Sequence, residues 1–407
     1  MRDAPGVGGR DTRRDRRPWR TASWPRTARG IAHRSARGPR TGRTRPRSVS
    51  RRSSSSSIPA AAASSRARRG AVQRPPPGRA LCAEFTRAQV ETNSPVCGTS
   101  EDAGRFLRSA RRELVRAAAG AGLTVVASGT PVLGDPASAR VSDGTRYADI
   151  ATHFGALREA HVVCGCHVHV GIPDRETAVE VAGHLRRWLP FLVALSANSP
   201  FQEGRDTGYA SWRTITWNRL PSAGPPPLFR SLAEHERAVG ALAGSGAILD
   251  RHMVYWDIRL SDHLPTLEIR VGDVAATADE ALLFAALTRG LVTRALSDVR
   301  HAMPAPEIGA PALRAAIWRA ARDGLEGRVP DPLTGEPLPG ALALDRILGA
   351  ALPGLEANGD AALVVGLLDR VRAAGSGAAR QRAFLNRRGR ITDVVDHLAA
   401  QTREGLP

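Results

Sequence analysis

Two histidines set two residues apart are the first feature of this chain whose types and spacing indicate chemistry. They lie in the run Cys164-Gly165-Cys166-His167-Val168-His169-Val170-Gly171, which otherwise has the composition of a buried strand. Alternate side chains of a strand share a face, so His167 and His169 point to one side, and Cys166 and Val168 point to the other. Two imidazoles directed into one space favour a chemical site.

A second strand pattern, Thr266-Leu267-Glu268-Ile269-Arg270-Val271, places a carboxylate beside a guanidinium. Glu268 and Arg270 share one face of this strand, and the apolar residues take the other face. Such a pair can hold a cation and an anion together, which suits a metal-bound phosphate. Taken alone, each strand is also compatible with a solvated sheet face, but the two patterns together favour a site.

The cysteines next to the histidines raise the alternative of a zinc site, because Cys and His are both zinc ligands. Strand alternation argues against it. Cys164 and Cys166 lie on the face opposite to His167 and His169, so one ion cannot collect all four side chains. The cysteines are better interpreted as small core residues. The four cysteines of the chain are too few and too unevenly placed for a disulfide framework, which fits a reducing compartment.

The positive charge of the chain is confined to its first 80 residues. The whole sequence has 58 Lys and Arg residues, 39 Asp and Glu residues and a net charge of +19. Residues 1–80 contain 22 Arg and 3 Asp, which accounts for all of that charge, and residues 81–407 contain 36 basic and 36 acidic residues. The charge therefore does not make the larger part a nucleic-acid-binding protein.

Residues 1–80 have no apolar periodicity and almost no aromatic residues, so we expect this Arg/Ser/Pro-rich segment to be disordered. Three interpretations stay open: a polyanion-binding arm, an Arg/Ser-rich targeting peptide, or an upstream stretch translated from a wrong start or frame. The complete absence of Lys indicates GC-rich coding DNA and favours the third. Nucleic-acid binding is expected only through this segment.

Residues 81–407 are long enough for one large domain with a substantial core. No apolar run approaches the ~20 residues of a membrane helix, so we expect a soluble, cytoplasmic protein without a membrane partner.

Short strands and amphipathic helices alternate, which indicates an α+β fold. The predicted strands are 84–92, 123–128, 162–170, 254–260 and 266–271, and the predicted helices are 99–120, 174–198 with a kink at Pro190, 278–300 and 312–324. The last two strands are predicted to form a hairpin.

Residues 199–230 are rich in Gly and Pro and contain Arg205, Asp206, Ser211 and Arg213 together with two tryptophans. Long irregular segments of this kind are uncommon unless they have a function. We interpret this one as a substrate-covering loop.

Several stretches, in order along residues 81–400, resemble the carboxylate–amine ligase family that includes glutamate–cysteine ligase type 2. The stretches are Gln89-Val90-Glu91-Thr92 with Pro95-Val96-Cys97, Gly165 to Gly171, Ala194 to Pro200, Gly204 to Ser211, Trp256-Asp257-Ile258-Arg259, Leu267 to Val271, and Gly324-Leu325-Glu326-Gly327. The resemblance implies a glutamine synthetase-like catalytic domain, in which a curved antiparallel sheet has helices packed on one side.

The resemblance also assigns expected roles to residues of this chain. Metal ligands would be Glu84, Glu91, His167 and Glu268; His169 would lie near the nucleotide phosphates; and Arg213, Arg259 and Arg270 would hold phosphate or a substrate carboxylate. Arg319 and Arg322 are candidate nucleotide contacts, with a solvated helix face as the open alternative. For Glu84 and Glu91 the open alternative is ordinary surface carboxylates.

The implied reaction is ATP-dependent amide formation. The γ-phosphoryl group of ATP activates a carboxylate, normally that of glutamate, and an amine such as cysteine attacks the acyl phosphate. Mg²⁺ and arginines are needed because the triphosphate is heavily charged. The oligomeric state is left open, a homo-oligomer included.

One departure from the family concerns its acidic first strand, which carries a Gly-x-Glu-x-Glu type motif. Residues 1–80 contain no glutamate, so the 81–407 domain is expected to lack that strand. Loss of an inner strand would remove part of the metal shell. We therefore expect impaired activity, and the alternative function is a catalytically impaired nucleotide- or metal-binding remnant of the family.

Overall fold

A three-stranded antiparallel sheet carries the two histidines and lies at the centre of the fold. The computed structural model describes residues 80–406. The strand order is β3-β7-β6, formed by β3 (Gly165–Gly171), β7 (Thr266–Asp273) and β6 (Ile258–Leu260). The predicted hairpin is confirmed, because β6 pairs with β7 and the register places Arg259 opposite Glu268. On its other side β7 pairs with β3, and His169 also lies opposite Glu268.

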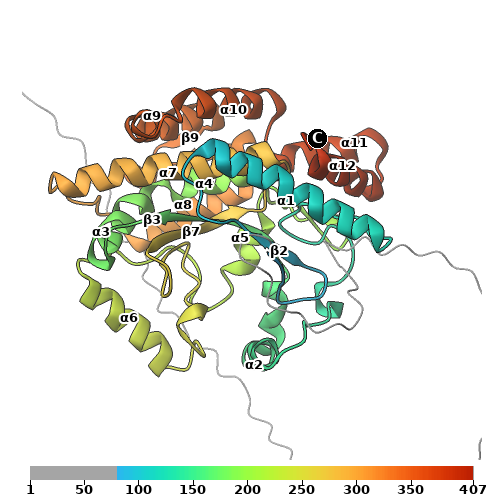
Figure 1. The fold of residues 1–407 in the computed structure, drawn as a ribbon, viewed down its shortest axis with the longest axis horizontal. Helices are drawn as coiled ribbons and strands as arrows, with labels where there is room; N and C mark the ends of the chain where they lie inside the picture. The colour runs from blue at the N-terminus through green and yellow to red at the C-terminus, as the bar shows by residue number, and fades with distance from the viewer. Residues whose placement is uncertain (1–79, 407) are drawn as a thin grey trace, which may run out of the picture. The chain divides into compact units, whose positions relative to one another are not determined.

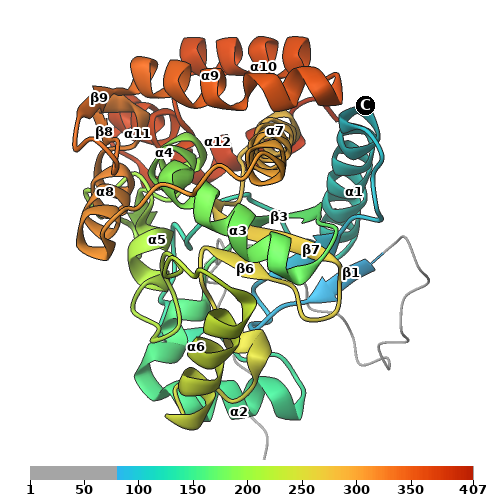
Figure 2. The ribbon, with the colours of Figure 1, turned by 90° about the vertical axis from the view of Figure 1, so that its left-hand side faces the viewer.

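Helices cover one face of this sheet, as Figures 1 and 2 show. The apolar side chains Val168, Ile269 and Ile258 point to that face and join one large core cluster with the covering helices. These helices are α3 (Arg175–Leu185), α4 (Leu189–Ser196) and the long α7 (Ala278–Arg300). Beyond α7 lie α9 (Gly340–Asn358) and α10 (Ala361–Ala374). The predicted α+β class, with an antiparallel sheet and helices on one side, is confirmed.

The two longest helices begin where side chains cap their free amides. Thr277 and Glu280 form a reciprocal capping box at the start of α7, so the predicted bounds 278–300 are confirmed. Thr99 accepts a hydrogen bond from the Asp102 amide at the start of α1 (Ser100–Gly120). Arg111 of α1 donates to the carbonyls of Ala275 and Ala276, which joins this helix to the segment that leaves β7.

The remaining elements are shorter or lie further from the sheet. They are α2 (Thr145–Phe154), α5 (Trp212–Trp217), α6 (Leu232–Gly244), α8 (Ala310–Asp323), α11 (Gly377–Arg388), α12 (Ile391–Arg403), and the paired strands β1 (Ala80–Ala83) with β2 (Val90–Asn93), β4 (Phe201–Gln202) with β5 (Arg205–Asp206), and β8 (Arg328–Pro330) with β9 (Pro337–Pro339). No helix among residues 80–406 combines the length and apolar character needed to cross a bilayer.

The prediction of one strand over 84–92 is wrong, because a turn divides this stretch. The backbone amide of Gln89 donates to the carbonyl of Thr86, and their side chains form a second hydrogen bond of 2.6 Å. Phe85, at the start of the turn, is buried in a second hydrophobic cluster. Only the end of the stretch is a strand, β2, which pairs with β1.

Two other predicted elements differ from the structure. Residues 123–128 form no strand, because their backbone is held by side chains: the Ala127 amide donates to Thr402 Oγ1, and the Ala127 carbonyl accepts from Asn198. The predicted helix over 174–198 is divided into α3 and α4 by a 3₁₀ turn, Arg186–Trp188, just before Pro190. The predicted disorder of 1–80 and the missing acidic strand concern residues outside the described range.

Candidate active site

The sheet face that is not covered by α3 and α7 collects the predicted polar residues of all three strands. We call it the histidine face and define it by His167 and His169 of β3, Glu268 and Arg270 of β7, and Arg259 of β6. The apolar neighbours Val168 and Ile269 point into the core. Strand alternation therefore places these five side chains together. Alternation in the sequence indicated this for the four residues of β3 and β7, and the family resemblance added Arg259.

Glu268 is the centre of the histidine face. Its Oε2 accepts hydrogen bonds from Arg259 at 2.6 and 2.9 Å, and its Oε1 pairs with Arg270. The side chain of Glu268 is only 3% exposed. Burial alone would raise the pKa of this carboxyl, but the nearby positive charge of Arg270 and Arg259 lowers it to about 2. Glu268 is therefore ionised at neutral pH.

Both histidines face the same oxygen of Glu268. His167 Nδ1 and His169 Nε2 each lie 3.6 Å from Glu268 Oε1. Burial, together with the charge of Arg270, keeps the pKa of His167 well below its usual value, and burial also lowers the pKa of His169. His169 Nδ1 lies 2.9 Å from Thr266 Oγ1. Both rings are thus neutral at pH 7 and can serve as acceptors or metal ligands.

Arg213, the first residue after the N-terminus of α5, lies against the sheet and is 3% exposed. Its guanidinium donates to the carbonyls of Arg270 and Val271 at 3.0 and 3.2 Å. These carbonyls belong to a β-bulge, where the register shifts between Cys166 and Val168. Arg213 therefore stabilises the bulge next to Arg270. This placement favours a positioning role over the predicted direct contact with phosphate or carboxylate.

Glu84 and Glu91 lie close to each other beside the histidine face and share a hydrogen bond. Burial and the neighbouring Glu84 carboxylate raise the pKa of Glu91 to about 7, with a further contribution from Glu268. Crowded carboxylates of this kind fit a bound cation, since the ion would remove their repulsion. Glu268 fits less well as a ligand, because both of its oxygens are held by arginines. Within residues 80–406, no group of three or more His, Cys, Asp or Glu side chains has the spacing to hold a metal ion.

Arg319 and Arg322 lie on α8, away from the histidine face. Arg319 pairs with Asp323 at 2.7 Å on the same helix. Arg322 donates to the carbonyl of Gly208 and lies over the ring of Tyr209, with 5.4 Å between the guanidinium carbon and the ring centroid. α8 packs against α4, α5 and β8. Among residues 80–406, neither arginine forms a hydrogen bond or ion pair with another candidate residue.

Asp257 is a residue of this face that sequence reasoning missed. It precedes β6 by one residue, and its carbonyl accepts a hydrogen bond of 2.8 Å from the Arg270 amide. Asp257 alternates with Ile258, which is buried in the core, and it therefore shares a face with Arg259. That alternation was visible in Trp256-Asp257-Ile258-Arg259 and could have identified it.

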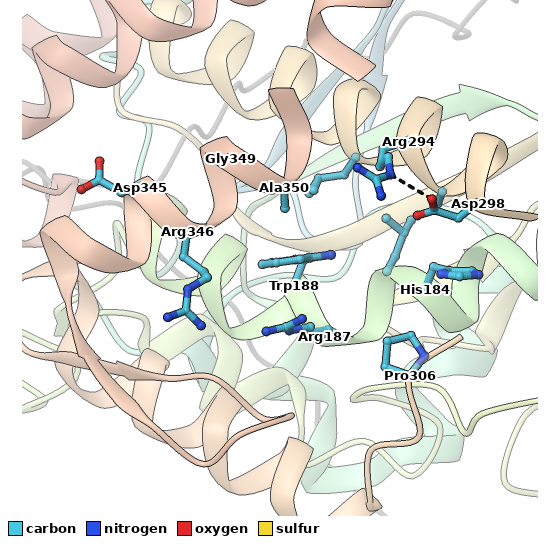
Figure 3. A pocket seen from close by; sticks show the side chains of 13 residues that line it. His184, Arg187, Trp188, Arg294, Asp298, Pro306, Asp345, Arg346, Gly349 and Ala350 are labelled. Carbon is cyan, nitrogen blue, oxygen red and sulfur yellow. Dashed lines mark hydrogen bonds and ion pairs between the residues drawn. The ribbon is translucent and has the colours of Figure 1, made fainter. Parts of the chain in front are cut away.

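A cavity of about 560 Å³ lies in the helical layer, on the other side of the sheet from the histidines. It is bordered by α3, α7 and α9, with Trp188 in its wall (Figure 3). Its charged residues are paired: Arg187 and Arg346 both bind the buried Asp331, at 2.5 and 3.1 Å, and Arg294 binds Asp298 at 2.9 Å. Large volume alone does not make this cavity the reaction site, whereas the histidine face combines titratable groups with shifted pKa values.

Comparisons with known proteins show which chains this one is similar to. The chain is 46% identical over 324 residues to a protein of Rhodococcus jostii (strain RHA1) that carries the provisional name glutamate–cysteine ligase 2-1, covering 80% of this chain and 87% of the relative. It is 46% identical over 322 residues to the provisionally named glutamate–cysteine ligase 2 of Salinispora arenicola (strain CNS-205), covering 79% and 85%.

The fold is similar to that of a solved structure. The crystal structure of glutamate–cysteine ligase from Francisella tularensis in complex with AMP matches with a TM-score of 0.51 and 10% sequence identity, covering 80% of this chain and 83% of that chain. At this identity the likeness concerns the fold alone. The model of the glutamate-cysteine ligase family 2 matches residues 49–397. Together with the relatives at 46% identity, this match shows that the chain belongs to glutamate–cysteine ligase family 2.

Proposed function

We propose that this protein is an ATP-dependent carboxylate–amine ligase that joins glutamate, through an acyl phosphate, to an amine such as cysteine. The observation that carries the proposal is the histidine face, where one ionised carboxylate lies between two arginines and two neutral histidines. Family membership supports the reaction class. The ligand named for the similar fold, AMP, is consistent with a nucleotide substrate.

Arg259 and Arg270 have the chemistry to hold anionic groups during phosphoryl transfer. Glu268 pre-orients both guanidinium groups, so little side-chain entropy is lost when a phosphate or carboxylate binds. Arg270 also keeps a buried Nε without a partner among the described residues. His169 is the more exposed of the two histidines, with 35% of its side chain accessible, and we place it near the phosphates.

The crowded pair Glu84 and Glu91 would hold Mg²⁺. His167 stays a predicted ligand, because among residues 80–406 it forms no group of three with these carboxylates that has the spacing to hold a metal ion. The ion would neutralise charge on the triphosphate. The arginines and histidines of the face would align the two reacting oxygens and exclude water. We also retain a cytoplasmic location and a homo-oligomer as predictions.

The overall reaction sets what the site must accomplish. The carboxylate oxygen of glutamate attacks the γ-phosphorus, and ADP leaves. The amine then attacks the acyl carbon, the carbon–oxygen bond to phosphate breaks, and phosphate leaves. An ammonium substrate loses two protons in forming the amide: phosphate takes one, and the other is released.

The direct test is ADP release by the purified full-length protein with ATP, Mg²⁺ and glutamate, with and without cysteine and a panel of other amines. Amine-dependent ADP release is the expected result. ADP release that no amine changes, from a folded protein that binds ATP, would contradict a ligase function.

A second candidate is a catalytically impaired remnant that binds nucleotide or metal. The absence of glutamate before Glu84 favours it, because the family resemblance implies an acidic first strand. In that case ATP binds but no ADP forms with any amine. Adding a family first strand before residue 81 should then restore ADP release, and no recovery would remove this explanation.

A further inference from the structure

Asp257 and Arg270 are direct neighbours across two strands. The Arg270 amide donates to the Asp257 carbonyl at 2.8 Å, and the next pair in the ladder is Ile258 with Ile269. Both isoleucines are buried in the main core. Asp257 and Arg270 therefore point to the opposite side, the histidine face, with their Cβ atoms about 5.5 Å apart.

These neighbours do not form an ion pair with each other. Arg270 is directed along its own strand to Glu268. Asp257 is 4% exposed, and among residues 80–406 its Oδ2 is buried without a hydrogen-bond donor. The Nε atoms of Arg270 and Arg213 are likewise buried and have no acceptor within the described part of the chain. Unsatisfied buried polar atoms are costly and uncommon, and here three of them come from residues that influence one another electrostatically.

The charges of these three groups, one carboxylate and two guanidinium groups, restrict which ligand can form hydrogen bonds with all of them. A metal ion would satisfy the carboxylate but would face two guanidinium groups. A phosphate would satisfy the arginines but would meet the Asp257 carboxylate. A ligand that offers a cationic donor and an anionic acceptor side by side satisfies both signs.

We propose that Asp257 and Arg270 bind the head group of an α-amino acid, with its ammonium on Asp257 Oδ2 and its carboxylate on Arg270 Nε. This inference rests on the proposed function and deepens it, because it assigns a substrate subsite to named residues. Arg213 holds the backbone of Arg270 in place through the Arg270 carbonyl. The same head group occurs in glutamate and in an amino-acid acceptor such as cysteine, so the experiment must separate these two sources.

The experiment measures ligand binding to the full-length protein by isothermal titration calorimetry. One arm compares L-glutamate with glutarate, and the other compares L-cysteine with 3-mercaptopropionate; each second ligand lacks only the amino group. In the wild type, at least one of the two amino acids should bind about tenfold more tightly than its analogue without the amino group, and this factor is the affinity ratio. Asp257→Asn should reduce that ratio to about twofold or less, while ATP affinity stays the same.

Asp262→Asn is the matched control. Asp262 lies in the turn between β6 and β7, where it pairs with Arg251 at 3.1 Å. The variant removes the same charge as Asp257→Asn; the charge of Asp262 acts on Arg259 but not on Asp257. The ratio should be unchanged in this variant. Because the wild-type comparison needs no variant, it remains decisive if Asp257→Asn folds poorly.

Three outcomes would overturn the inference: equal binding of amino acid and analogue to the wild type, an unchanged ratio in Asp257→Asn, or an equal loss of ATP affinity in that variant. ADP release is measured separately in the same preparations. Amine-dependent ADP release without amino-group discrimination would reject this subsite and leave the ligase function standing. Tighter binding of the amino acid than of its analogue, without any ADP release, would support the subsite and reject the ligase function.

Discussion

Glu268 holds residues of three strands in one network of charges. It is buried, and its partners Arg259 and Arg270 are only 13% and 10% exposed. A buried carboxylate between two guanidinium groups contributes little net stability, because each charge has lost its hydration. The Glu268 carboxylate instead orients the side chains of Arg259 and Arg270, which would otherwise be mobile.

Removing the charge of Glu268 should therefore be costly for both folding and function. Glu268→Gln leaves two buried guanidinium groups without a carboxylate, and we expect the free energy of unfolding to fall by about 3 kcal/mol, with loss of ADP release. Urea denaturation measures the first effect. Glu101→Gln is the control: Glu101 pairs with Arg105 at the surface of α1, and its loss should change stability by less than about 0.5 kcal/mol. Equal effects of the two changes would refute the network.

Asp257 should make stability depend on pH. Burial raises the pKa of this carboxyl from 3.8 to about 7, against the opposing charges of Arg213 and Arg270. Between these two values the folded state binds more protons than the unfolded state, so the free energy of unfolding falls as pH rises through this window. At pH 8, without substrates, Asp257→Asn should be more stable than the wild type by roughly 1–3 kcal/mol.

This difference should vanish toward pH 4, where the wild-type carboxyl is protonated as well. Urea titrations of both proteins at the two pH values provide the check. A variant less stable than the wild type at pH 8 would show that Asp257 is satisfied in the folded protein, and it would weaken the case for a substrate contact.

Sequence reasoning found most of the histidine face but not all of it. Period-two alternation was sufficient to place His167, His169, Glu268 and Arg270. When one face of a strand is buried among apolar residues, the polar residues of that strand must lie on the other face. It could not show that Glu268 is held by arginines, since side-chain direction depends on competing partners. Asp257 was missed although its alternation with Ile258 was visible, because a lone carboxylate in a strand is usually solvated.

At the scale of elements, the bulge between β3 and β7 depends on a glycine. A Cβ atom on Gly165 would overlap the guanidinium of Arg213, which donates to the bulge carbonyls. Gly171, at the other end of the same strand, has open space at that position.

We therefore expect Gly165→Ala to lower the free energy of unfolding by about 1–3 kcal/mol and to reduce kcat more than it changes ATP affinity. Gly171→Ala should be close to neutral. Chemical denaturation and steady-state ADP release test both variants. If the two alanine variants are equivalent, Arg213 does not stabilise the bulge.

The elements that sequence predicted well have strong local signals. The bounds of α7 follow from its capping box, and the β6–β7 hairpin follows from alternation on both sides of a short turn. The failures lie where tertiary contacts decide. Residues 84–92 alternate like a strand, but burial of Phe85 and the Thr86–Gln89 hydrogen bonds favour a turn. Residues 123–128 are apolar enough for a strand, but the backbone of Ala127 forms hydrogen bonds with the side chains of Thr402 and Asn198 and not with a neighbouring strand.

At the scale of the whole molecule, a bound substrate should stabilise the fold it bridges. Elements far apart in sequence, β2, β3, β6 and β7, contribute to one site, so Mg²⁺ and ATP at about 100 times their dissociation constant should add roughly 2.7 kcal/mol to the free energy of unfolding. A thermal melt with Mg²⁺ and ATP should show a higher Tm than a melt with ATP and excess EDTA. An identical rise in both would show that ATP binds without the metal.

The bulge in β7 has a consequence for how this strand tolerates change. Glu268 and Asp273 are five positions apart in the sequence, and in a regular strand they would lie on opposite faces. Yet Asp273 accepts hydrogen bonds from Ser199 and Ser211, while the preceding Gly272 is directed at the ring of Phe284 in the core. The extra residue in β7 shifts the alternation of side chains by one position, so that polar residues before and after the bulge lie on the same face. A regular strand of the same length, without the bulge opposite His167, would turn Asp273 into the core, so the irregularity of this strand is as constrained as its composition.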